Sequence, residues 1–558
     1  MKHVKQTAAA VILSAAIAMP AVSGTAAAAE AAVTAAAASE AAVAGYVPVR
    51  EIAEKAGAVV TWENSTRTVT VKRGGMTLIL QIGSAQAELN GKTIELGETI
   101  ELVNEKTVVP MELLRQLRLD QEVSAETPAL TGTAAVAAAF LEQLNAGEFA
   151  AAHKSLSPNL QAALPLPGLQ QIWQMAGQQA GELGKMLSAN AVSNGVHDNV
   201  TFIFEGTSVP VEVTIRLDKA GLVDDFGLAP AQPSVGYIKP SYDDDTKYTE
   251  QEVVIGEGAF ALPGTLTMPA GEGPFPVVVL VHGSGPHDRD STIGGVKPFR
   301  DLAVGLAAQN IAVLRYEKVT KEHNLKFALD PKQTLQRETV DDALEAVELL
   351  KGTKGIDPAR IYVAGHSQGG MAVPKMIGLD QAGDIAGAVI LSAPSLGLAE
   401  TLIEQQQEVV ERVKGLGFPA EVTAAYEQSA AAWIEIGKMV ADPQNTVDHI
   451  PANFPLPQPY WWFEQKNYQP AETAKKQNLP LLIMQGENDW QVSMKQFDGW
   501  KKTLQERKDV QFKSYPGVNH VLTVYEGVSI GAEYGQPANV APAIIDDIAK
   551  WVTGGSLE

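Results

Sequence analysis

The hydrophobic pattern of the chain changes twice along its length. Residues 46–122 alternate apolar and polar positions in short runs, such as Thr68–Lys72 and Thr77–Gln81. This period of two predicts a small β-rich domain with half-buried strands. Residues 128–232 begin with helical segments, the last over Leu169–Met186, and end with alternating strands. Helices followed by an antiparallel sheet predict a small α+β domain.

The third pattern covers residues 236–555, where fully apolar strands alternate with amphipathic helices. The strands include "PVVVLVHG", "IAVLRYE", "RIYVAGHS", "AGAVILSAP" and "LPLLIMQGEND". Continuous apolar strands separated by helices predict an α/β domain, with a parallel sheet that is covered on both faces. Such sheets carry their chemistry beyond the carboxyl ends of the strands, so we look for candidate site residues directly after these runs.

A long helical insertion interrupts this third domain at about residues 396–478. A minimal connection between two strands needs far fewer residues, so the insertion is interpreted as a cap above the strand ends. Its aromatic run "YWWF", residues 460–463, allows two interpretations. The rings either line an acyl pocket or anchor the cap to the body of the domain.

The first 29 residues have the arrangement of a secretory signal peptide. Lys2 and Lys5 form a basic start, "AAAVILSAAIAM" is a short apolar core, and small residues follow Pro20. The apolar core is too short for a comfortable bilayer span, which favours a cleaved signal over an anchor and predicts no membrane span in the mature chain. Residues 30–45, rich in alanine, are interpreted as a tether. The predicted location is extracellular, secreted or on the surface of a bacterial cell.

Composition narrows the function classes. A chain of 558 residues with 45% hydrophobic and 19% charged residues predicts several globular domains. Its formal net charge of −22 argues against nucleic acid or an anionic membrane surface as a partner, because both would repel it. The absence of cysteine excludes a disulfide framework and thiolate catalysis.

The strand "RIYVAGH" runs into the pentapeptide Gly-His-Ser-Gln-Gly, residues 365–369. A Gly-x-Ser-x-Gly turn between a strand and a helix predicts that the Ser367 hydroxyl stands above the sheet as a nucleophile. The amide of Gln368 then lies at a helix N-terminus, where it can donate to an oxyanion. His366 faces away from the nucleophile and is interpreted as a packing residue. Taken alone, the pentapeptide also allows an ordinary glycine-rich connection.

A serine nucleophile needs a histidine base, and the base needs an acid to fix its tautomer. In α/β-hydrolases these residues follow the chain order serine, acid, histidine. Asp489 comes directly after an apolar strand, in "LIMQGENDWQV", and His520 is the only histidine after it. We therefore predict Asp489 as the acid and His520 as the base.

A second oxyanion donor is expected where "VVLVHGSGPHDRD" leaves its strand. The amide of Ser284, or that of Gly283, is the candidate, because a glycine-rich loop after a strand can bring its amides to the nucleophile. The competing interpretation is a metal cluster made from the histidines and aspartates of this stretch, His282, His287, Asp288 and Asp290. The glycines favour the oxyanion loop, so no metal and no cofactor are predicted. Asp288-Arg289-Asp290 and Glu317 are interpreted as structural.

Residues 247–553 resemble a secreted α/β-hydrolase esterase of the dienelactone-hydrolase-related type. The matching stretches are "HGSGPHDRD", "VLRYEK", "TVDDALEAVELL", "GHSQGGMAVPKM" and "GENDWQV". The family pattern reads RYD-K-R at the second stretch, where this chain has Glu317 and, in place of the last arginine, Val319. The resemblance implies an α/β-hydrolase fold with a Ser-His-Asp triad that hydrolyses small to medium carboxylic esters.

The two N-terminal domains carry resemblances of their own. Residues 45–120 resemble the amine-oxidase-type stalk module of secreted and surface proteins, and the α+β domain resembles nuclear-transport-factor-like domains. Both are interpreted as accessory domains that can contact the cell envelope. The predicted function is a serine carboxylesterase. A peptidase, thioesterase or acyltransferase on the same triad would fit the same residues, as would a surface binding protein with a vestigial hydrolase domain.

Overall fold

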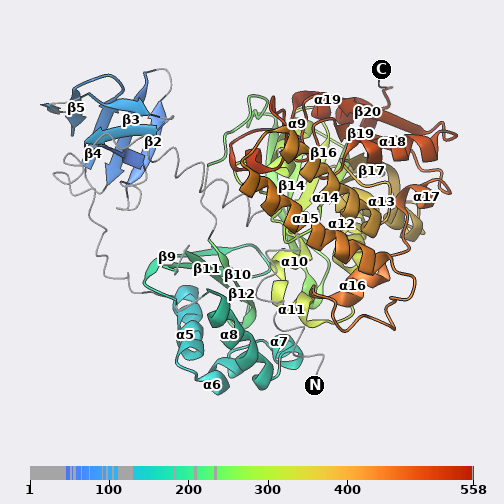
Figure 1. The fold of residues 1–558 in the computed structure, drawn as a ribbon, viewed down its shortest axis with the longest axis horizontal. Helices are drawn as coiled ribbons and strands as arrows, with labels where there is room; N and C mark the ends of the chain where they lie inside the picture. The colour runs from blue at the N-terminus through green and yellow to red at the C-terminus, as the bar shows by residue number, and fades with distance from the viewer. Residues whose placement is uncertain are drawn as a thin grey trace. The chain divides into compact units, whose positions relative to one another are not determined.

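The computed structural model describes residues 46–557 apart from 51–52, 54–57, 64–65, 74–75, 91, 96–98, 104–105, 111–129, 181–182, 207–209, 232–235 and 556. The described residues form two compact units, one before residue 111 and one from Leu130 onward (Figure 1). The predicted signal peptide and the tether lie outside the described residues.

The first unit is β-rich, as the period of two predicts. Five strands form one antiparallel sheet in chain order: β2 (Val59–Glu63), β3 (Thr68–Arg73), β4 (Met76–Gln81), β5 (Gln86–Leu89) and β6 (Lys92–Glu95). Three more pair in the order β1 (Tyr46–Pro48), β8 (Lys106–Pro110) and β7 (Glu101–Val103). Alternate residues such as Val69, Val71, Leu78 and Leu80 are buried in one core. The predicted strands within the described residues are confirmed.

The second unit begins with an α+β part. Its helices are α5 (Thr133–Asn145), α6 (Phe149–Lys154), α7 (Pro158–Ala163) and α8 (Leu166–Ala180). Its antiparallel sheet has the order β12 (Val223–Pro230), β11 (Val211–Leu217), β10 (Asp198–Phe204) and β9 (Met186–Ser193). The helix predicted over Leu169–Met186 is present as α8, but its predicted end is wrong, since Met186 starts β9. Gly184 has already joined the sheet there, because its N–H donates to the carbonyl of Glu205 at 2.9 Å.

A mixed eight-stranded sheet forms the centre of the second unit. Its strands have the order β13 (Tyr248–Ile255), β14 (Leu262–Pro269), β16 (Ala312–Tyr316), β15 (Phe275–Val281), β17 (Ile356–His366), β18 (Ile385–Leu391), β19 (Leu481–Gly486) and β20 (Val510–Tyr515). The six strands from β16 to β20 in this order are parallel, as predicted. The first two are antiparallel, which the prediction of a parallel sheet missed. A short connection containing η2 (Gly258–Phe260) joins them, and only antiparallel neighbours can be joined so briefly.

Helices cover both faces of this sheet. The alternating residues of β15 show the two layers, since Val277 and Val279 belong to one apolar core, and Val278 and Leu280 to another. On the first face lie α12 (Asp341–Lys351), α13 (Gln368–Leu379), α17 (Pro470–Ala474) and α18 (Met494–Leu504). On the second face lie α9 (Pro298–Ala307) and α19 (Pro542–Val552). Short helices lie in the connections between these strands and helices: α10 (Val319–Glu322), α11 (Asn324–Leu329), η4 (Ala532–Gly535) and the π-helical turn η3 (Gln336–Val340).

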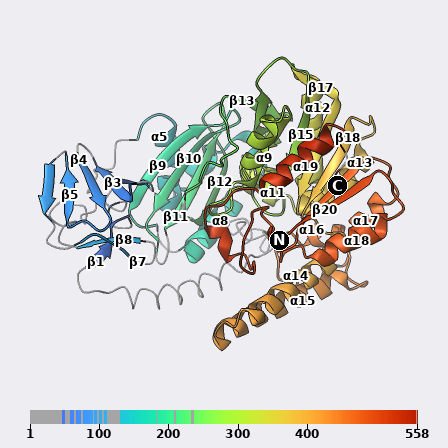
Figure 2. The same cartoon turned by 90° about the horizontal axis from the view of Figure 1, so that it is seen from above.

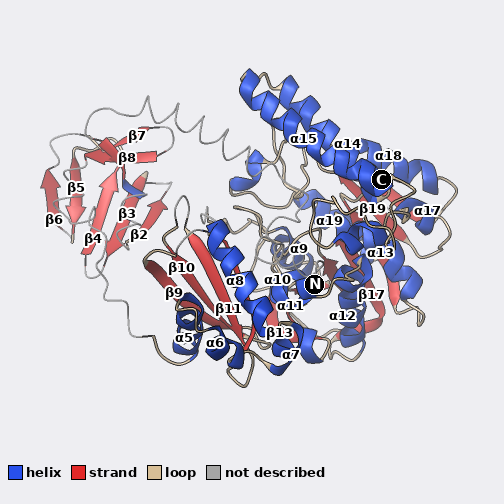
Figure 3. Cartoon of the chain, turned by 60° about the horizontal axis from the view of Figure 1, so that its bottom comes forward, coloured by secondary structure: helices blue, strands red, loops and turns tan. Residues whose placement is uncertain are grey.

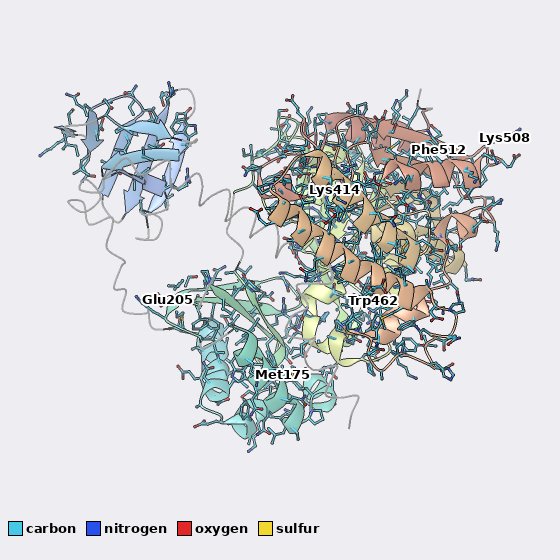
Figure 4. The ribbon with its side chains drawn as sticks, viewed as in Figure 1. Met175, Glu205, Lys414, Trp462, Lys508 and Phe512 are labelled. Atoms are coloured by element: carbon cyan, nitrogen blue, oxygen red, sulfur yellow. The ribbon has the colours of Figure 1, made fainter. Side chains whose placement is uncertain are left out.

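The helical insertion lies between β18 and β19. Its long helices α14 (Leu398–Gly415) and α15 (Ala420–Ala441) lie side by side (Figures 2 and 3), and α16 (Pro459–Glu464) follows them. Trp461, Trp462 and Phe463 are buried in one cluster with residues of α14 and α15; Figure 4 labels Trp462 on α16. These three rings therefore pack within the insertion. Among the described residues, none of the helices has the length and apolar content that a membrane span requires.

Candidate active site

Ser367 stands between the end of β17 and the start of α13. Its φ is +55° and its ψ is −120°, a strained backbone conformation for a residue other than glycine. The turn is held from both sides, because the Ser367 N–H donates to the carbonyl of Leu391 at 2.9 Å and its own carbonyl accepts from Met371 at 2.9 Å. A strained serine between a strand and a helix is the geometry expected of a nucleophile elbow.

The glycines of the pentapeptide are required by close backbone contacts. A Cβ atom at Gly365 would lie 2.4 Å from the carbonyl oxygen of Gly369. A Cβ atom at Gly369 would lie 2.3 Å from the carbonyl oxygen of Val281, at the end of β15. Real Cβ atoms essentially never come this close, so a side chain at Gly365 would open the elbow itself, and one at Gly369 would separate the elbow from β15.

Asp489 and His520 are brought together, although they follow different strands. Nδ1 of His520 lies 2.8 Å from Oδ2 of Asp489. The other carboxylate oxygen accepts from the amides of Gln491 at 2.8 Å and Val492 at 2.9 Å, and Gln485 donates to Oδ2 at 3.1 Å. The buried carboxylate thus fixes the imidazole with its proton on Nδ1, which leaves Nε2 as the proton acceptor.

His366 has a larger role than the packing residue that the sequence predicts. Its ring centroid lies 4.7 Å from that of His520, and its Nε2 donates to the carbonyl of His520 at 2.7 Å. Burial, with a further contribution from His520, lowers the pKa of His366 well below its usual value, so this ring is neutral. His366, a residue of the elbow, therefore holds the candidate base His520 beside the elbow.

The glycine-rich loop after β15 approaches the elbow. A Cβ atom at Gly283 would lie 3.2 Å from the Cβ atom of Ser367. Ser284, Ser367 and Gln368 line one pocket of about 10 Å³, together with residues from the start of the insertion such as Leu398. The candidate nucleophile and the residues of the two candidate oxyanion donors therefore share one small cavity.

The side chains of the competing metal cluster are engaged within the loop region. His282 donates to the carbonyl of Tyr316 at 2.6 Å, and His287 to that of Ser284 at 2.7 Å. Asp290 pairs with Lys297 at 2.9 Å and with Arg315. These contacts support the loop interpretation, and the absence of a metal stays a prediction.

Glu317 belongs to an ion-pair network at the neighbouring strand end. Its carboxylate lies 2.9 Å from Nε of Arg289, which also pairs with Glu252 at 2.8 Å. Burial raises the pKa of Glu317 to about 7, although Arg289 opposes this shift. These contacts agree with the structural role that the sequence suggests.

Arg412 is a residue that sequence reasoning missed. From α14 its guanidinium donates to the backbone carbonyls of Asn488 at 2.9 Å, Asp489 at 3.0 Å and Ser529 at 3.1 Å. It therefore connects the insertion to the loops that carry the candidate acid. No motif surrounds it, so only its place in the tertiary structure reveals this role.

A second cluster of titratable groups lies between the α+β sheet and α10. His197 lies 2.9 Å from Asp224 and 2.6 Å from Glu322. Burial alone would lower the pKa of His197, but the two carboxylates raise it above its usual value. Asp224 and His323 complete a set of possible metal ligands with His197, but both ring nitrogens of His197 face carboxylates, and Lys326 also contacts Asp224. This arrangement fits an ion network better than a metal site.

A larger cavity of about 410 Å³ adjoins this network. Charged side chains of both neighbouring parts line it, including Arg216, Glu317 and Lys321. None of the six predicted site residues borders it, whereas Ser284, Ser367 and Gln368 line the smaller pocket.

Three parts of the chain match known families. Residues 31–131 match the copper amine oxidase N-terminal domain, residues 137–220 match a protein of unknown function (DUF3887), and residues 273–526 match the serine aminopeptidase S33 family. The first match confirms the predicted amine-oxidase-type module. The resemblance of the α+β part to nuclear-transport-factor-like domains stays a prediction.

Similar proteins include several esterases. Among solved structures, Est1E from Butyrivibrio proteoclasticus is 19% identical and covers 54% of this chain and 97% of its own, with a TM-score of 0.35. The esterase domain of a Rhodothermus marinus protein is 14% identical over 54% and 97%, with a TM-score of 0.33.

The match to one curated relative covers more residues than the hydrolase domain contains. Esterase EstD of Thermotoga maritima is 30% identical to this chain over 414 residues, which are 74% of this chain and 93% of that esterase. Because this identity covers nearly the whole of a known esterase, the chain belongs to the EstD family of α/β-hydrolases and is a carboxylic ester hydrolase.

Proposed function

We propose that the protein is a secreted serine carboxylesterase that hydrolyses small to medium carboxylic esters through Ser367, His520 and Asp489. The observation that carries this proposal is the 2.8 Å contact between His520 and Asp489, next to a serine elbow in a strained conformation. A nucleophile, a base with a fixed tautomer and a buried acid are the parts that acyl transfer requires.

The proposed reaction forms and breaks one acyl-enzyme. Nε2 of His520 takes the proton of Ser367 as Oγ attacks the ester carbonyl carbon, while Asp489 stabilises the imidazolium. The amides of Gln368 and of Ser284 or Gly283 donate to the oxyanion. The imidazolium then protonates the leaving alcohol. A water molecule that is deprotonated by His520 attacks the acyl-enzyme and releases the acid.

The proposal includes a cap function for the insertion. The pocket beside Ser367 is small, with a volume of about 10 Å³ that holds roughly one water molecule. Leu398, at the start of α14, borders this pocket. Movement of the insertion would therefore widen the site and set the length of the acyl chain that it accepts.

Labelling and turnover test the proposed nucleophile. A fluorophosphonate should label the wild-type protein at Ser367, and Ser367→Ala should remove both labelling and the hydrolysis of p-nitrophenyl esters. A series of acyl chain lengths should show the highest kcat/KM with short to medium chains. A wild-type protein that hydrolyses esters but takes no label would contradict the serine mechanism.

A second candidate uses the same triad on another acyl group. The match of residues 273–526 to the serine aminopeptidase family favours a peptidase over a thioesterase or an acyltransferase. Aminoacyl p-nitroanilides and acyl thioesters should be turned over far more slowly than esters by this protein. A higher kcat/KM for the anilides would favour the peptidase. A binding protein with a vestigial hydrolase domain would neither label nor turn over any of them.

The proposal places the mature protein outside the cell. The basic start and short apolar core of residues 1–29 support export, and the net charge of −22 disfavours nucleic acid as a partner. The two N-terminal domains would contact the cell envelope. Mass spectrometry of the secreted protein should find its N-terminus just after Ala28 or Ala29.

A further inference from the structure

Lys318 is a buried cation whose contacts lie next to the candidate oxyanion loop. It lies two residues after the end of β16, and its side chain is only 2% exposed. Its Nζ donates to the carbonyl of Gly283 at 2.7 Å and to Glu338 at 2.6 Å. A buried ammonium group needs such partners, because an unpaired charge is very costly away from water.

The segment around Lys318 holds this loop at three carbonyl groups. Besides the contact with Gly283, the backbone N–H of Lys318 donates to the carbonyl of His287 at 3.1 Å. The hydroxyl of Thr320 donates to the carbonyl of Gly285 at 3.1 Å. The loop is therefore fixed along its length by one short segment.

The contact with Gly283 determines where the next amide points. The carbonyl of Gly283 and the N–H of Ser284 belong to one planar peptide unit, in which the two groups point in opposite directions. When Lys318 holds the oxygen, the N–H of Ser284 must point away from Lys318. Ser284 shares the small pocket with Ser367, so this orientation decides whether the amide can meet an oxyanion there.

Glu338 connects this arrangement to the helical insertion. One carboxylate oxygen accepts from Lys318, and the other accepts from Nε1 of Trp461 on α16 at 2.7 Å. The same π-helical turn carries Thr339, whose hydroxyl accepts from the side chain of Gln368 at 3.2 Å. One turn of helix thus contacts the insertion and Gln368 directly, and it reaches Gly283 through Lys318.

We infer that Lys318 is a positioning residue that orients the Ser284 amide toward the oxyanion, and that Glu338 couples this orientation to the docking of the insertion through Trp461. This inference rests on the proposed serine mechanism. When the insertion docks, the Trp461 N–H holds Glu338, Glu338 holds Lys318, and Lys318 turns the peptide unit. The oxyanion site is then complete only when the insertion is in place.

Lys318→Met tests the first link. Loss of an oxyanion donor lowers kcat by about 10² to 10³, so a misdirected donor should lower kcat by about 10-fold to 100-fold, with KM changed less than about twofold. Inhibition by a trifluoromethyl ketone, which forms an oxyanion on the enzyme, should weaken by the same factor as kcat/KM. Lys321→Met, on the short helix α10 that begins directly after Lys318, is the control and should keep kcat within about twofold. A folded Lys318→Met protein with wild-type kcat overturns the inference.

Two neighbouring tryptophans test the second link. Trp461→Phe removes the N–H that reaches Glu338, whereas Nε1 of the equally buried Trp462 has no hydrogen-bond partner among the described residues. Trp461→Phe should lower kcat by about threefold to tenfold, and Trp462→Phe should leave it within about twofold. In the Lys318→Met background, Trp461→Phe should have no further effect. Equal effects of the two tryptophan substitutions overturn the coupling. If Lys318→Met does not fold, the comparison of these two substitutions tests the inference instead.

Fluorophosphonate labelling distinguishes a failure of the proposed function from a failure of the inference about Lys318. A wild-type protein without label at Ser367 contradicts the proposed function itself. A labelled wild-type protein combined with a fully active Lys318→Met variant contradicts only the role of Lys318.

Discussion

Arg412 of the helical insertion donates to the backbone carbonyl of Asp489, the candidate acid, at 3.0 Å. Two more of its hydrogen bonds reach Asn488 and Ser529, so one side chain holds three points of the loops beside the site. The insertion is therefore hydrogen-bonded to the backbone of the candidate acid itself.

Arg412→Met should lower kcat without removing the nucleophile. The loops beside the site lose three hydrogen bonds, two of them on the loop that carries Asp489, and a misplacement of about 1 Å at a catalytic group can cost about 10²-fold in rate. We expect kcat to fall by about tenfold, while fluorophosphonate still labels Ser367. Lys414→Met on the same helix is the matched control, because Lys414, which Figure 4 labels, is exposed. Its Nζ pairs with Glu427 at 2.6 Å. Equal kcat values for the two variants would refute the role of Arg412.

Asp489→Asn should abolish most of the activity with little change in the fold. The amide cannot hold the imidazole with its proton on Nδ1, because an NH₂ group facing Nδ1 favours the opposite tautomer. A decrease in kcat of about 10³- to 10⁴-fold is expected, measured with a p-nitrophenyl ester of short chain. A variant within tenfold of the wild type would show that another residue serves as the acid.

Gly369→Ala should disrupt the elbow. The new Cβ atom would lie 2.3 Å from the carbonyl oxygen of Val281, and this backbone atom cannot move aside without separating α13 from β15. We expect a loss of stability of about 1–3 kcal/mol together with a large loss of kcat, measured by denaturant unfolding and ester hydrolysis.

Gly177→Ala provides the control for Gly369→Ala. Gly177 is exposed within α8, and a Cβ atom there meets nothing within 4 Å. Alanine in an exposed helix should raise the stability by about 0.5–1 kcal/mol and leave kcat unchanged. A similar response of both glycines would mean that the elbow tolerates a side chain.

His197 should make stability depend on pH. The pKa of His197 is raised overall by Asp224 and Glu322, so its contribution is complete below about pH 6.5 and is lost as pH rises through the folded-state pKa. Burial alone would raise the pKa of Glu322, but His197 and Arg216 lower it to about 2. The stabilisation from Glu322 is therefore complete above about pH 4.5 and is lost as pH falls toward 2. The stabilisation from this network is therefore greatest between about pH 4.5 and 6.5.

Thermal unfolding of His197→Ala across this range measures the effect. Removal of one partner from a buried ion network costs about 3–5 kcal/mol, and the loss should be largest near pH 5.5 and smaller above pH 8. An equal loss of stability at every pH would show that His197 contributes through packing and not through its charge.

Much of the fold followed from local patterns. The apolar strands of residues 275–281, 361–366 and 481–486 are long and continuous, so their burial in a sheet was predictable from their residues alone. The elbow was predictable too, because Gly-x-Ser-x-Gly is a local requirement of one tight turn. By contrast, the antiparallel direction of β13 and β14, at one end of the sheet, was missed, since strand direction depends on the partner that a strand meets.

The sequence by itself determined which residue types stand at each strand end and, through the chain order, which carboxylate and which histidine form the candidate pair with Ser367. Only the tertiary structure decided which side chains hold them: His366 on the carbonyl of His520, Arg412 on the carbonyl of Asp489, and Lys318 on the carbonyl of Gly283. The physical reason is that these supports bind backbone oxygens, which every residue carries. They leave no pattern in the sequence, and distance in space alone selects their partners.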